Sequence, residues 1–324
     1  MPSKVRWGVI GLGNVAKEWF LPALLKAENA ELGALASRSP EKLSQFVEMF
    51  GLPVKTYSDY THLLDDPEID AVYIALPNAL HKEWTIKAAR RGKHVLCEKP
   101  LALKADDCRE IIAACRASGV LLMEGFMYRY ADRTRKAQEL VLSGRLGEIR
   151  HIDSCFFSLA SKARGNLVDP ALGGGALHDL GCYPLNIVGL LANDKPVSIS
   201  AEAVPFNGVD VVLSAVLKYS SGLLATIHCG WVNESRTLDT TIMGTEGTLI
   251  VPRTFRGEAG FLSLITPDGE REEIPVKETD MFLEEITQFS AAVLGRPALL
   301  NSLEESVQGV EVMEEILKKA GIRP

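Results

Sequence analysis

The sequence predicts an α/β protein of two domains, a doubly wound parallel sheet followed by an α+β domain with a mostly antiparallel sheet. Length is the first observation, because 324 residues correspond to about two typical domains. The second is the order of segments up to residue 125, where short apolar runs alternate with helical patterns. The third is a change after Gly125 to strand-like segments joined by turns. We therefore expect domains at residues 1–125 and 126–324.

The expected strands of the first domain are apolar almost throughout, and amphipathic segments separate them. Strands separated by helices of this length pair in parallel through right-handed crossovers, and apolar strands imply that both sheet faces are covered. One helix has clear limits, because Ser39 is a preferred N-cap, Pro40 suits the first turn and Gly51 ends the pattern. The expected strands are 4–11, 30–37, 71–77, 93–100 and 120–125, and the expected helices are 14–27, 39–51, 81–92 and 104–119.

The second domain begins with a helical pattern over 131–143 and a long, partly alternating segment over 147–160. A glycine-rich stretch follows and continues as a helical run to Ala192. The turn signals "SSG" and "GTEG" then separate strands that are expected to form hairpins. The later expected strands are 196–206, 210–219, 223–232, 237–244 and 247–251, and the last expected helices are 281–294 and 303–319.

The composition narrows the classes of function. The net charge is −7 without a basic run, whereas a nucleic-acid backbone needs a positive footprint, so no nucleic-acid partner is expected. No run approaches the ~20 apolar residues of a membrane span, and the first residues do not form a signal peptide. None of the six cysteines forms a CxxC pair, and the histidines show no metal-ligand spacing. We expect a cytoplasmic protein with reduced thiols, without a metal and without a membrane partner.

The segment after the first expected strand fits the pattern G-x-G-x-x-G/A and opens the first expected helix. Gly11 permits the tight turn, Gly13 lets the backbone approach a pyrophosphate, and Ala16 allows close packing of the helix on the strand. The alternative is a glycine turn without a ligand. The predicted dinucleotide-binding residues here are Gly11, Leu12, Gly13, Asn14, Val15 and Ala16.

The end of the second expected strand indicates which dinucleotide is bound. Proteins that prefer NAD usually place Asp or Glu there, on the ribose 2′-hydroxyl. This chain has Ser37 and Arg38 instead. An arginine offers paired donors and a charge to a 2′-phosphate. We therefore predict NADP as the cofactor, with NAD the less favoured alternative.

The stretch "GGGALHDLGCYP" combines three glycines with polar residues. Asp179 and Tyr183 are four residues apart and would share one face of a regular α-helix, whereas His178 is rotated about 140° from Tyr183 and is expected to have no catalytic role. Pro184 removes a helical hydrogen bond and disfavours the α conformation at Tyr183, so we expect a kink or two short helices meeting there. The three glycines are expected to keep the approach to the cofactor free of side chains.

Taken in order, the glycine turn, "ALPNALHKEW", "CEKP" and "GGGALHDLGCYP" resemble the family of glucose–fructose oxidoreductase, inositol dehydrogenase and rhizopine-catabolism proteins. The stretch "GGGALHDLGCYP" is most similar to the branch of D-xylose dehydrogenases, dimeric dihydrodiol dehydrogenases and 3-ketosugar reductases. The resemblance implies a Rossmann domain, then an α/β domain whose open sheet joins copies into a dimer or tetramer. It also implies hydride transfer between NAD(P) and a sugar-like carbinol or ketone.

The resemblance also assigns roles to particular residues. Glu98 and Lys99 match the cofactor-ribose and catalytic positions, and the bond between the lysine and the proline is cis in many members. Arg129 matches an arginine that the family usually has, and Arg164 matches a cofactor- or substrate-side arginine of some members, although both also suit surface or interdomain positions. The positions that line the nicotinamide end of the cofactor are matched by Leu76, Pro77, Asn78 and His81.

Oxidation of a carbinol also needs a base for the hydroxyl proton, and Lys99 and Tyr183 are the two candidates. Asp179 would bind a sugar hydroxyl, orient Lys99, or do both. The family more often has histidine at the Tyr183 position, which favours the branch with tyrosine. Two alternatives stay open, a regulatory protein that binds the cofactor without turnover and a reductase of the biliverdin-reductase type.

Overall fold

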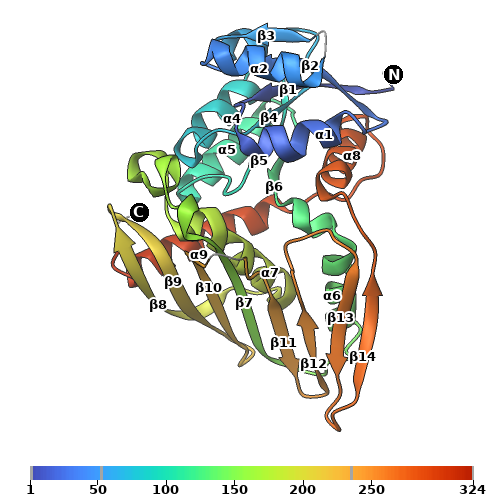
Figure 1. Cartoon of the computed structure of the whole chain (residues 1–324), viewed down its shortest axis with the longest axis vertical. Helices are drawn as coiled ribbons and strands as arrows, with labels where there is room; N and C mark the ends of the chain where they lie inside the picture. The colour runs from blue at the N-terminus through green and yellow to red at the C-terminus, as the bar shows by residue number, and fades with distance from the viewer. Residues whose placement is uncertain (1–2, 52–53, 234–235, 323–324) are drawn as a thin grey trace. The chain divides into compact units, whose positions relative to one another are not determined.

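The computed structural model describes residues 3–51, 54–233 and 236–322. The chain divides into two compact units, unit 1 with Met1–Met127 and Phe282–Val307, and unit 2 with Tyr128–Met281 and Gln308–Pro324. Residues 282–307 thus group with the first unit and not with the second, where the sequence placed them. The predicted fold class is confirmed, because unit 1 contains a parallel sheet of six strands and unit 2 a largely antiparallel sheet of eight (Figure 1).

The sheet of unit 1 has the strand order β3-β2-β1-β4-β5-β6, and its pairs are parallel. This is the order of a doubly wound dinucleotide-binding domain, in which ligands gather at the carboxyl ends of the strands. The three-residue strand β3 and the short helix after it were not predicted, because neither has a long apolar run. The strands are β1 (Val5–Ile10), β2 (Ala30–Ala36), β3 (Lys55–Tyr57), β4 (Ala71–Ile74), β5 (His94–Glu98) and β6 (Leu122–Gly125).

The helices of unit 1 follow the predicted limits most closely where capping residues define them. The Ser39 side chain accepts a hydrogen bond from the Lys42 N–H, and Gly51 ends the helix in the left-handed conformation. The helical segments are η1 (Ala16–Phe20), α1 (Leu21–Leu24), α2 (Pro40–Phe50), α3 (Tyr60–Leu64), η2 (Asn78–Leu80), α4 (His81–Ala89), α5 (Ala105–Ala117) and α8 (Met281–Val293), with η3 (Met127–Tyr130) at the boundary.

The sheet of unit 2 has the order β14-β13-β12-β11-β7-β10-β9-β8. Strands β7 and β10 pair in parallel, and the other neighbours are antiparallel. Strands β13 and β14 were not predicted, and the strand expected from residue 237 begins at Thr240. The strands are β7 (Ile149–Leu159), β8 (Pro196–Phe206), β9 (Val209–Tyr219), β10 (Leu224–Asn233), β11 (Thr240–Gly244), β12 (Gly247–Val251), β13 (Gly260–Ile265) and β14 (Arg271–Val276).

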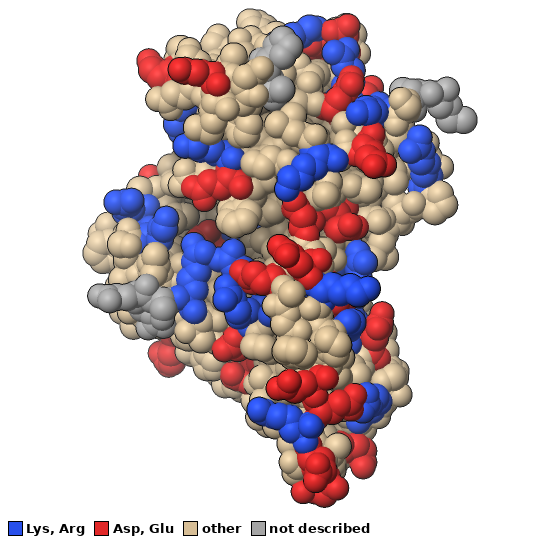
Figure 2. Space-filling model, turned by 45° about the vertical axis from the view of Figure 1, so that its right-hand side comes forward, with Lys and Arg blue, Asp and Glu red and all other residues tan. Residues whose placement is uncertain are grey.

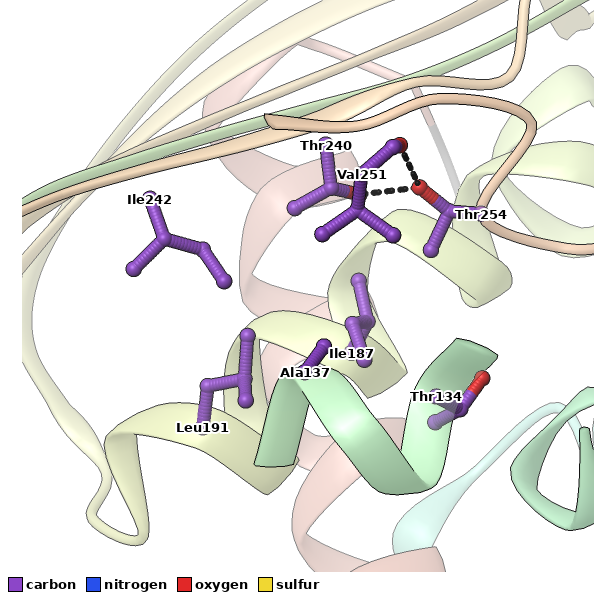
Figure 3. Close-up of a pocket in the computed structure, with 8 residues that line it drawn as sticks. All are labelled: Thr134, Ala137, Ile187, Leu191, Thr240, Ile242, Val251 and Thr254. Carbon is purple, nitrogen blue, oxygen red and sulfur yellow. Dashed lines mark hydrogen bonds between the residues drawn. The ribbon is translucent and has the colours of Figure 1, made fainter. Parts of the chain in front are cut away.

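Helices α6 and α7 pack on one face of this sheet (Figure 1). A small pocket remains between them and strands β11 and β12 (Figure 3). Its wall is mostly apolar, and Thr254 Oγ1 lies within hydrogen-bond distance of Val251 O at 2.8 Å and of Thr240 Oγ1 at 2.9 Å, so these hydroxyls are occupied within the protein. The helical segments of unit 2 are α6 (Asp132–Leu142), η4 (Ala160–Lys162), η5 (Gly165–Val168), η6 (Pro170–Leu172), η7 (Leu177–Gly181), α7 (Cys182–Ala192) and α9 (Leu303–Lys319), the last of which begins in unit 1.

On the face shown in Figure 2, Lys and Arg side chains lie interspersed with Asp and Glu side chains. No helix in the described part of the chain is long and apolar enough to span a bilayer. Among the same residues, no group of three or more His, Cys, Asp or Glu side chains is arranged to hold a metal ion.

Candidate functional site

The glycine turn after β1 combines one crowded position with one open position. Gly11 has φ +94°, and a Cβ atom there would lie 2.3 Å from the carbonyl oxygen of Ala75. A Cβ atom at Gly13 would meet nothing within 4 Å. Leu12 and Ala16 are buried, whereas Asn14 and Val15 are exposed. The turn therefore leaves free space above its second glycine, which is where a dinucleotide-binding loop admits the pyrophosphate.

The helix after this turn is not a regular α-helix. Its segment η1 is π-helical, and α1 follows directly with Pro22 at its second position. A proline lacks the N–H that would bond to the carbonyl four residues earlier, here that of Glu18. That carbonyl lies inside η1, so the wider turn coincides with the missing hydrogen bond. Single π-turns of this kind are frequent at functional sites.

Ser37 and Arg38 lie directly after β2, as the sequence predicts. Ser37 is buried, and its hydroxyl accepts a hydrogen bond from the Ser39 N–H at 3.2 Å. Arg38 is exposed, and its guanidinium carbon lies 6.0 Å from the centre of the Tyr60 ring. Arg38 forms no ion pair with the residues that the structure describes, so its charge is available to a ligand.

The turns after β4 and β5 are joined through His81. This residue is fully buried, with Nδ1 2.8 Å from Pro100 O and Nε2 2.9 Å from Leu76 O. Burial lowers the pKa of His81 against the effect of these two carbonyls, and the positive charge of Lys99 lowers it further. Leu76 is buried, and Pro77 and Asn78 are half-buried. The ring predicted to contact the cofactor thus has both nitrogens occupied by backbone, and any effect on a ligand acts through the two turns.

Glu98 ends β5 with both carboxylate oxygens engaged. Its Oε1 accepts a hydrogen bond from the Tyr73 hydroxyl, and its Oε2 accepts the Lys99 N–H at 3.3 Å. The Lys99–Pro100 peptide bond is cis. Within unit 1 the structure therefore brings the predicted residues Glu98, Lys99 and His81 together at the carboxyl edge of the sheet, where β1 and its glycine turn also end.

The glycines before η7 serve the packing of unit 2. Gly173 and Gly175 have φ of +76° and +120°, which favour glycine. A Cβ atom at Gly174 would lie 2.7 Å from Leu167 O, and one at Gly175 would lie 2.4 Å from Asp210 Oδ1. The space beside Gly174 and Gly175 is thus filled by the protein itself, whereas the sequence led us to expect glycines that keep the approach to the cofactor open.

Segment η7 is π-helical and continues into α7, so the predicted junction of two helices lies at Gly181–Cys182, two residues before the expected place. The Cys182 N–H bonds to Leu177 O, five residues earlier. The expectation that Asp179 and Tyr183 share one face depends on a regular α-helix, and the π-helical turn between them removes that regularity. Asp179 is half-buried, Tyr183 is the second residue of α7, and Pro184 is the third. His178 is buried, with Nδ1 3.2 Å from Gly174 O.

The Tyr183 ring lies in an aromatic cluster of unit 2. Ring centres of Phe156, Phe255 and Tyr128 lie 5.4, 5.5 and 5.9 Å from that of Tyr183. Only 8% of Tyr183 is exposed, so its ring is held in one place and largely shielded from water.

Arg256 is a neighbour of Tyr183 that the sequence did not reveal. Burial and the positive charge of Arg236 lower the pKa of Arg256, while Glu258 and the ionised form of Tyr183 raise it. By the same interaction, a charged Arg256 favours the ionised form of Tyr183. The segment "TFRGEA" fits no motif, because this electrostatic interaction depends on how the chain after β12 folds and not on a local pattern.

The two predicted arginines lie in different surroundings. Arg129 is half-buried in η3, and Arg164 is exposed and directly precedes η5. Neither position by itself assigns a ligand.

Comparisons with known proteins agree with this arrangement. Residues 5–126 match the model of the oxidoreductase family with an NAD-binding Rossmann fold, GFO_IDH_MocA, and residues 134–250 match the GFO/IDH/MocA C-terminal domain. The chain is 34% identical to the D-xylose 1-dehydrogenase (NADP(+)) 2 of Haloferax volcanii, over 97% of each chain.

Two solved structures share the fold over 98% of both chains. One is the 3-ketoreductase KijD10 of Actinomadura kijaniata in complex with NADP and TDP-benzene, with 30% identity and a TM-score of 0.89. The other is the aldose-aldose oxidoreductase of Caulobacter crescentus complexed with glycerol, with 28% identity and a TM-score of 0.89. The chain therefore belongs to the GFO/IDH/MocA oxidoreductase family and is an NAD(P)-dependent oxidoreductase.

Proposed function

We propose that the chain transfers hydride between NADP and a carbinol or ketone of a sugar or cyclic polyol. The observation that carries this proposal is Lys99, which follows the anchored carboxylate of Glu98 at the carboxyl edge of the parallel sheet. Ligands of doubly wound domains gather at this edge. The open position at Gly13 lies in the turn after β1, a strand of the same sheet.

The residues of unit 1 fit a dinucleotide. The free space above Gly13 suits a pyrophosphate at the start of a helix. Ser37 and Arg38 offer a hydroxyl and an uncommitted positive charge where NAD-specific domains have an acid, which supports NADP as the cofactor. When bound, the cofactor supplies the hydride acceptor or donor.

For the proton, Lys99 and Tyr183 both remain candidates. A free tyrosine has a pKa near 10. For Tyr183 to act as a base near pH 7, its pKa must therefore fall by about three units, which corresponds to ~4 kcal/mol. A charged Arg256 supports this route, because it favours the ionised form of Tyr183. The aromatic surroundings keep water from the ring and strengthen this interaction, although burial by itself disfavours the ionised form. Asp179 is proposed to orient a substrate hydroxyl, with Arg129 and Arg164 as further ligand contacts.

The names of the relatives support a sugar-like substrate, since they describe oxidation of D-xylose and reduction of a keto group. We also propose that the protein is cytoplasmic and forms a homodimer or homotetramer through the eight-stranded sheet. Val216, Leu224 and Met243 are exposed on strands of this sheet. Light scattering coupled to size-exclusion chromatography measures the assembly, and a monomer at micromolar concentration would contradict it.

An NADP(H)-linked screen of aldoses, inositols, 3-ketosugars and dihydrodiols, run in both directions, tests the reaction. Lys99→Met should keep NADP binding and lose most turnover, whereas Lys104→Met, which changes an exposed lysine nearby, should behave as the wild type. Full activity of Lys99→Met would contradict the assignment. Equal or better use of NAD would contradict the cofactor choice, and binding without turnover on any substrate would favour the regulatory alternative.

A further inference from the structure

Glu124 is a buried acid near the end of β6. Only 3% of this residue is exposed, and Leu122 and Met123 before it on the strand are buried and apolar. A carboxyl group in such a place destabilises the fold unless hydrogen-bond donors satisfy it. The structure shows such a donor, because Glu124 Oε1 accepts the N–H of Leu101 at 2.8 Å. Glu124 thus reaches from its own strand to the turn that follows the neighbouring strand, β5.

This hydrogen bond satisfies both of its partners. Leu101 is fully buried, and a buried N–H without a partner costs free energy comparable to a lost hydrogen bond. The register of the sheet places the acid within reach, since Glu124 pairs with Cys97, the residue before the last of β5. The backbone oxygen of Glu124 in turn accepts Asn301 Nδ2 at 3.2 Å, which holds this end of β6. The turn after β5 therefore explains why an acid lies among the apolar residues of β6.

Two side chains hold this turn from the two sides of β5. His81 Nδ1 lies 2.8 Å from Pro100 O, and Glu124 holds the N–H of the next residue, Leu101. Strands β4 and β6 flank β5, and His81 begins the helix that follows β4. Lys99, which is half-buried, directly precedes the two backbone groups that are held. The direction in which the Lys99 side chain leaves the sheet is therefore set by groups on both neighbouring strands and their connections.

We propose that Glu124 is a positioning residue for Lys99, which acts by holding the Leu101 N–H. The geometry requires an acceptor oxygen at the length of a glutamate side chain, which a glutamine also has and a shorter aspartate lacks. The inference rests on the proposed function in the role that it gives to Lys99. It adds that this role depends on a residue of β6 that does not touch the reacting atoms.

The first test uses cofactor-free protein, so that it is independent of turnover. Traces of acetic anhydride label lysine amines according to their reactivity, and mass spectrometry then compares Lys99 with Lys104, an exposed lysine of the same connection. Glu124→Met lacks the acceptor, so the ratio of Lys99 to Lys104 labelling should rise about threefold or more as the turn loosens. Glu124→Gln keeps the acceptor and should keep the ratio of the wild type.

The second test measures kcat with the sugar that gives the highest turnover in the NADP(H)-linked screen. Glu124→Met and Glu124→Asp should lower kcat about tenfold or more, because small displacements of a catalytic group have large effects on rate. The dissociation constant of NADPH should stay within about threefold of the wild type. Glu124→Gln should restore kcat to within about threefold. In a Lys99→Met background, Glu124→Met should cause no further loss, because the acid acts through the lysine.

Leu122→Ala is the matched control on the same strand. It removes buried volume two residues before Glu124 and should lower the melting temperature, while the labelling ratio and kcat stay as in the wild type. If Glu124 served only the stability of β6, Leu122→Ala and Glu124→Met would change the labelling ratio and kcat alike, and the inference would be overturned.

Wild-type labelling and kcat in Glu124→Met would also overturn the inference, as would equal losses in the methionine and glutamine variants. If Glu124→Met does not fold, Glu124→Asp takes its place, since it keeps the carboxylate but is too short to hold the Leu101 N–H, and wild-type values in it would overturn the inference. Failure of the proposed function looks different. Lys99→Met would then turn over as the wild type does, or no sugar would be turned over, while the labelling ratio would still report on Glu124.

Discussion

Two glycine turns, one in each unit, lead into similar helical segments but have different roles. Each opens a π-helical segment, η1 or η7, and each is followed within three residues of that segment by a proline in an α-helix. In unit 1, the position of Gly13 is open. In unit 2, Gly174 and Gly175 are pressed against Leu167 and Asp210.

The comparison teaches that a glycine-rich motif does not by itself indicate a ligand. Open space beside a glycine allows a bound molecule to approach the backbone, whereas filled space shows that the glycine is needed for the fold. The first turn is therefore expected to affect binding and the second to affect stability. Four substitutions separate these two effects.

The largest effect is expected for Gly175→Ala. Its Cβ atom would meet Asp210 Oδ1 at 2.4 Å on a backbone with φ +120°, so we expect a loss of at least ~3 kcal/mol in the free energy of unfolding. Urea unfolding followed by circular dichroism measures this loss. A stability within ~0.5 kcal/mol of the wild type would remove the distinction between the two turns.

The next effect is expected for Gly13→Ala, on binding alone. Nothing lies within 4 Å of the added methyl group, so the free energy of unfolding should stay within ~0.5 kcal/mol of the wild type. The dissociation constant of NADPH should rise at least tenfold, or ~1.4 kcal/mol, because the methyl group occupies the approach to the pyrophosphate. Fluorescence titration measures it, and unchanged affinity would show that this turn does not hold the cofactor.

A smaller, pH-dependent effect is expected for Asp210→Asn. Asp210 accepts the Leu177 N–H at 2.7 Å, and burial raises its pKa above the ordinary 3.8, against the effects of that N–H and of His178. Above pH 3.8 the unfolded state loses its proton first, so wild-type stability falls as the pH rises toward the folded pKa. The asparagine variant lacks this loss and should gain ~1 kcal/mol relative to the wild type between pH 4 and pH 7. Urea unfolding measures the free energy of unfolding of both proteins at pH 4 and pH 7. An equal change between the two pH values in the wild type and the variant would contradict this prediction.

The smallest effect is expected for Gly189→Ala, which serves as the matched control for the glycines of unit 2. Gly189 lies inside α7 with nothing within 4 Å of an added Cβ atom. Alanine is the better helix former, so the free energy of unfolding should increase by ~0.5–1 kcal/mol. Thermal unfolding measures the change, and a decrease would show that crowding in unit 2 extends beyond the turn before η7.

Much of unit 1 could be predicted from local patterns. Continuous apolar strands and capping residues such as Ser39 and Gly51 define elements without reference to distant contacts. Short or exposed elements could not be predicted in this way, as β3, α3, β13 and β14 show. The π-helical segments were also missed, because Pro22 and Pro184 indicate a break in a helix without indicating how the preceding turn adapts.

The sequence by itself determined the order of the longer elements, the class of the fold, the glycine turn and the positions of Lys99, Asp179 and Tyr183, because each depends on a pattern within a few residues. Only the tertiary structure decided which glycines are open and which are crowded. It also decided that His81 joins two turns, that the charges of Arg256 and Tyr183 influence each other, and that burial raises the pKa of Glu285 well above its ordinary value. The physical reason is that free space, burial and electrostatic neighbours are set by segments far apart in the chain, such as β5 and α8, which no local pattern relates.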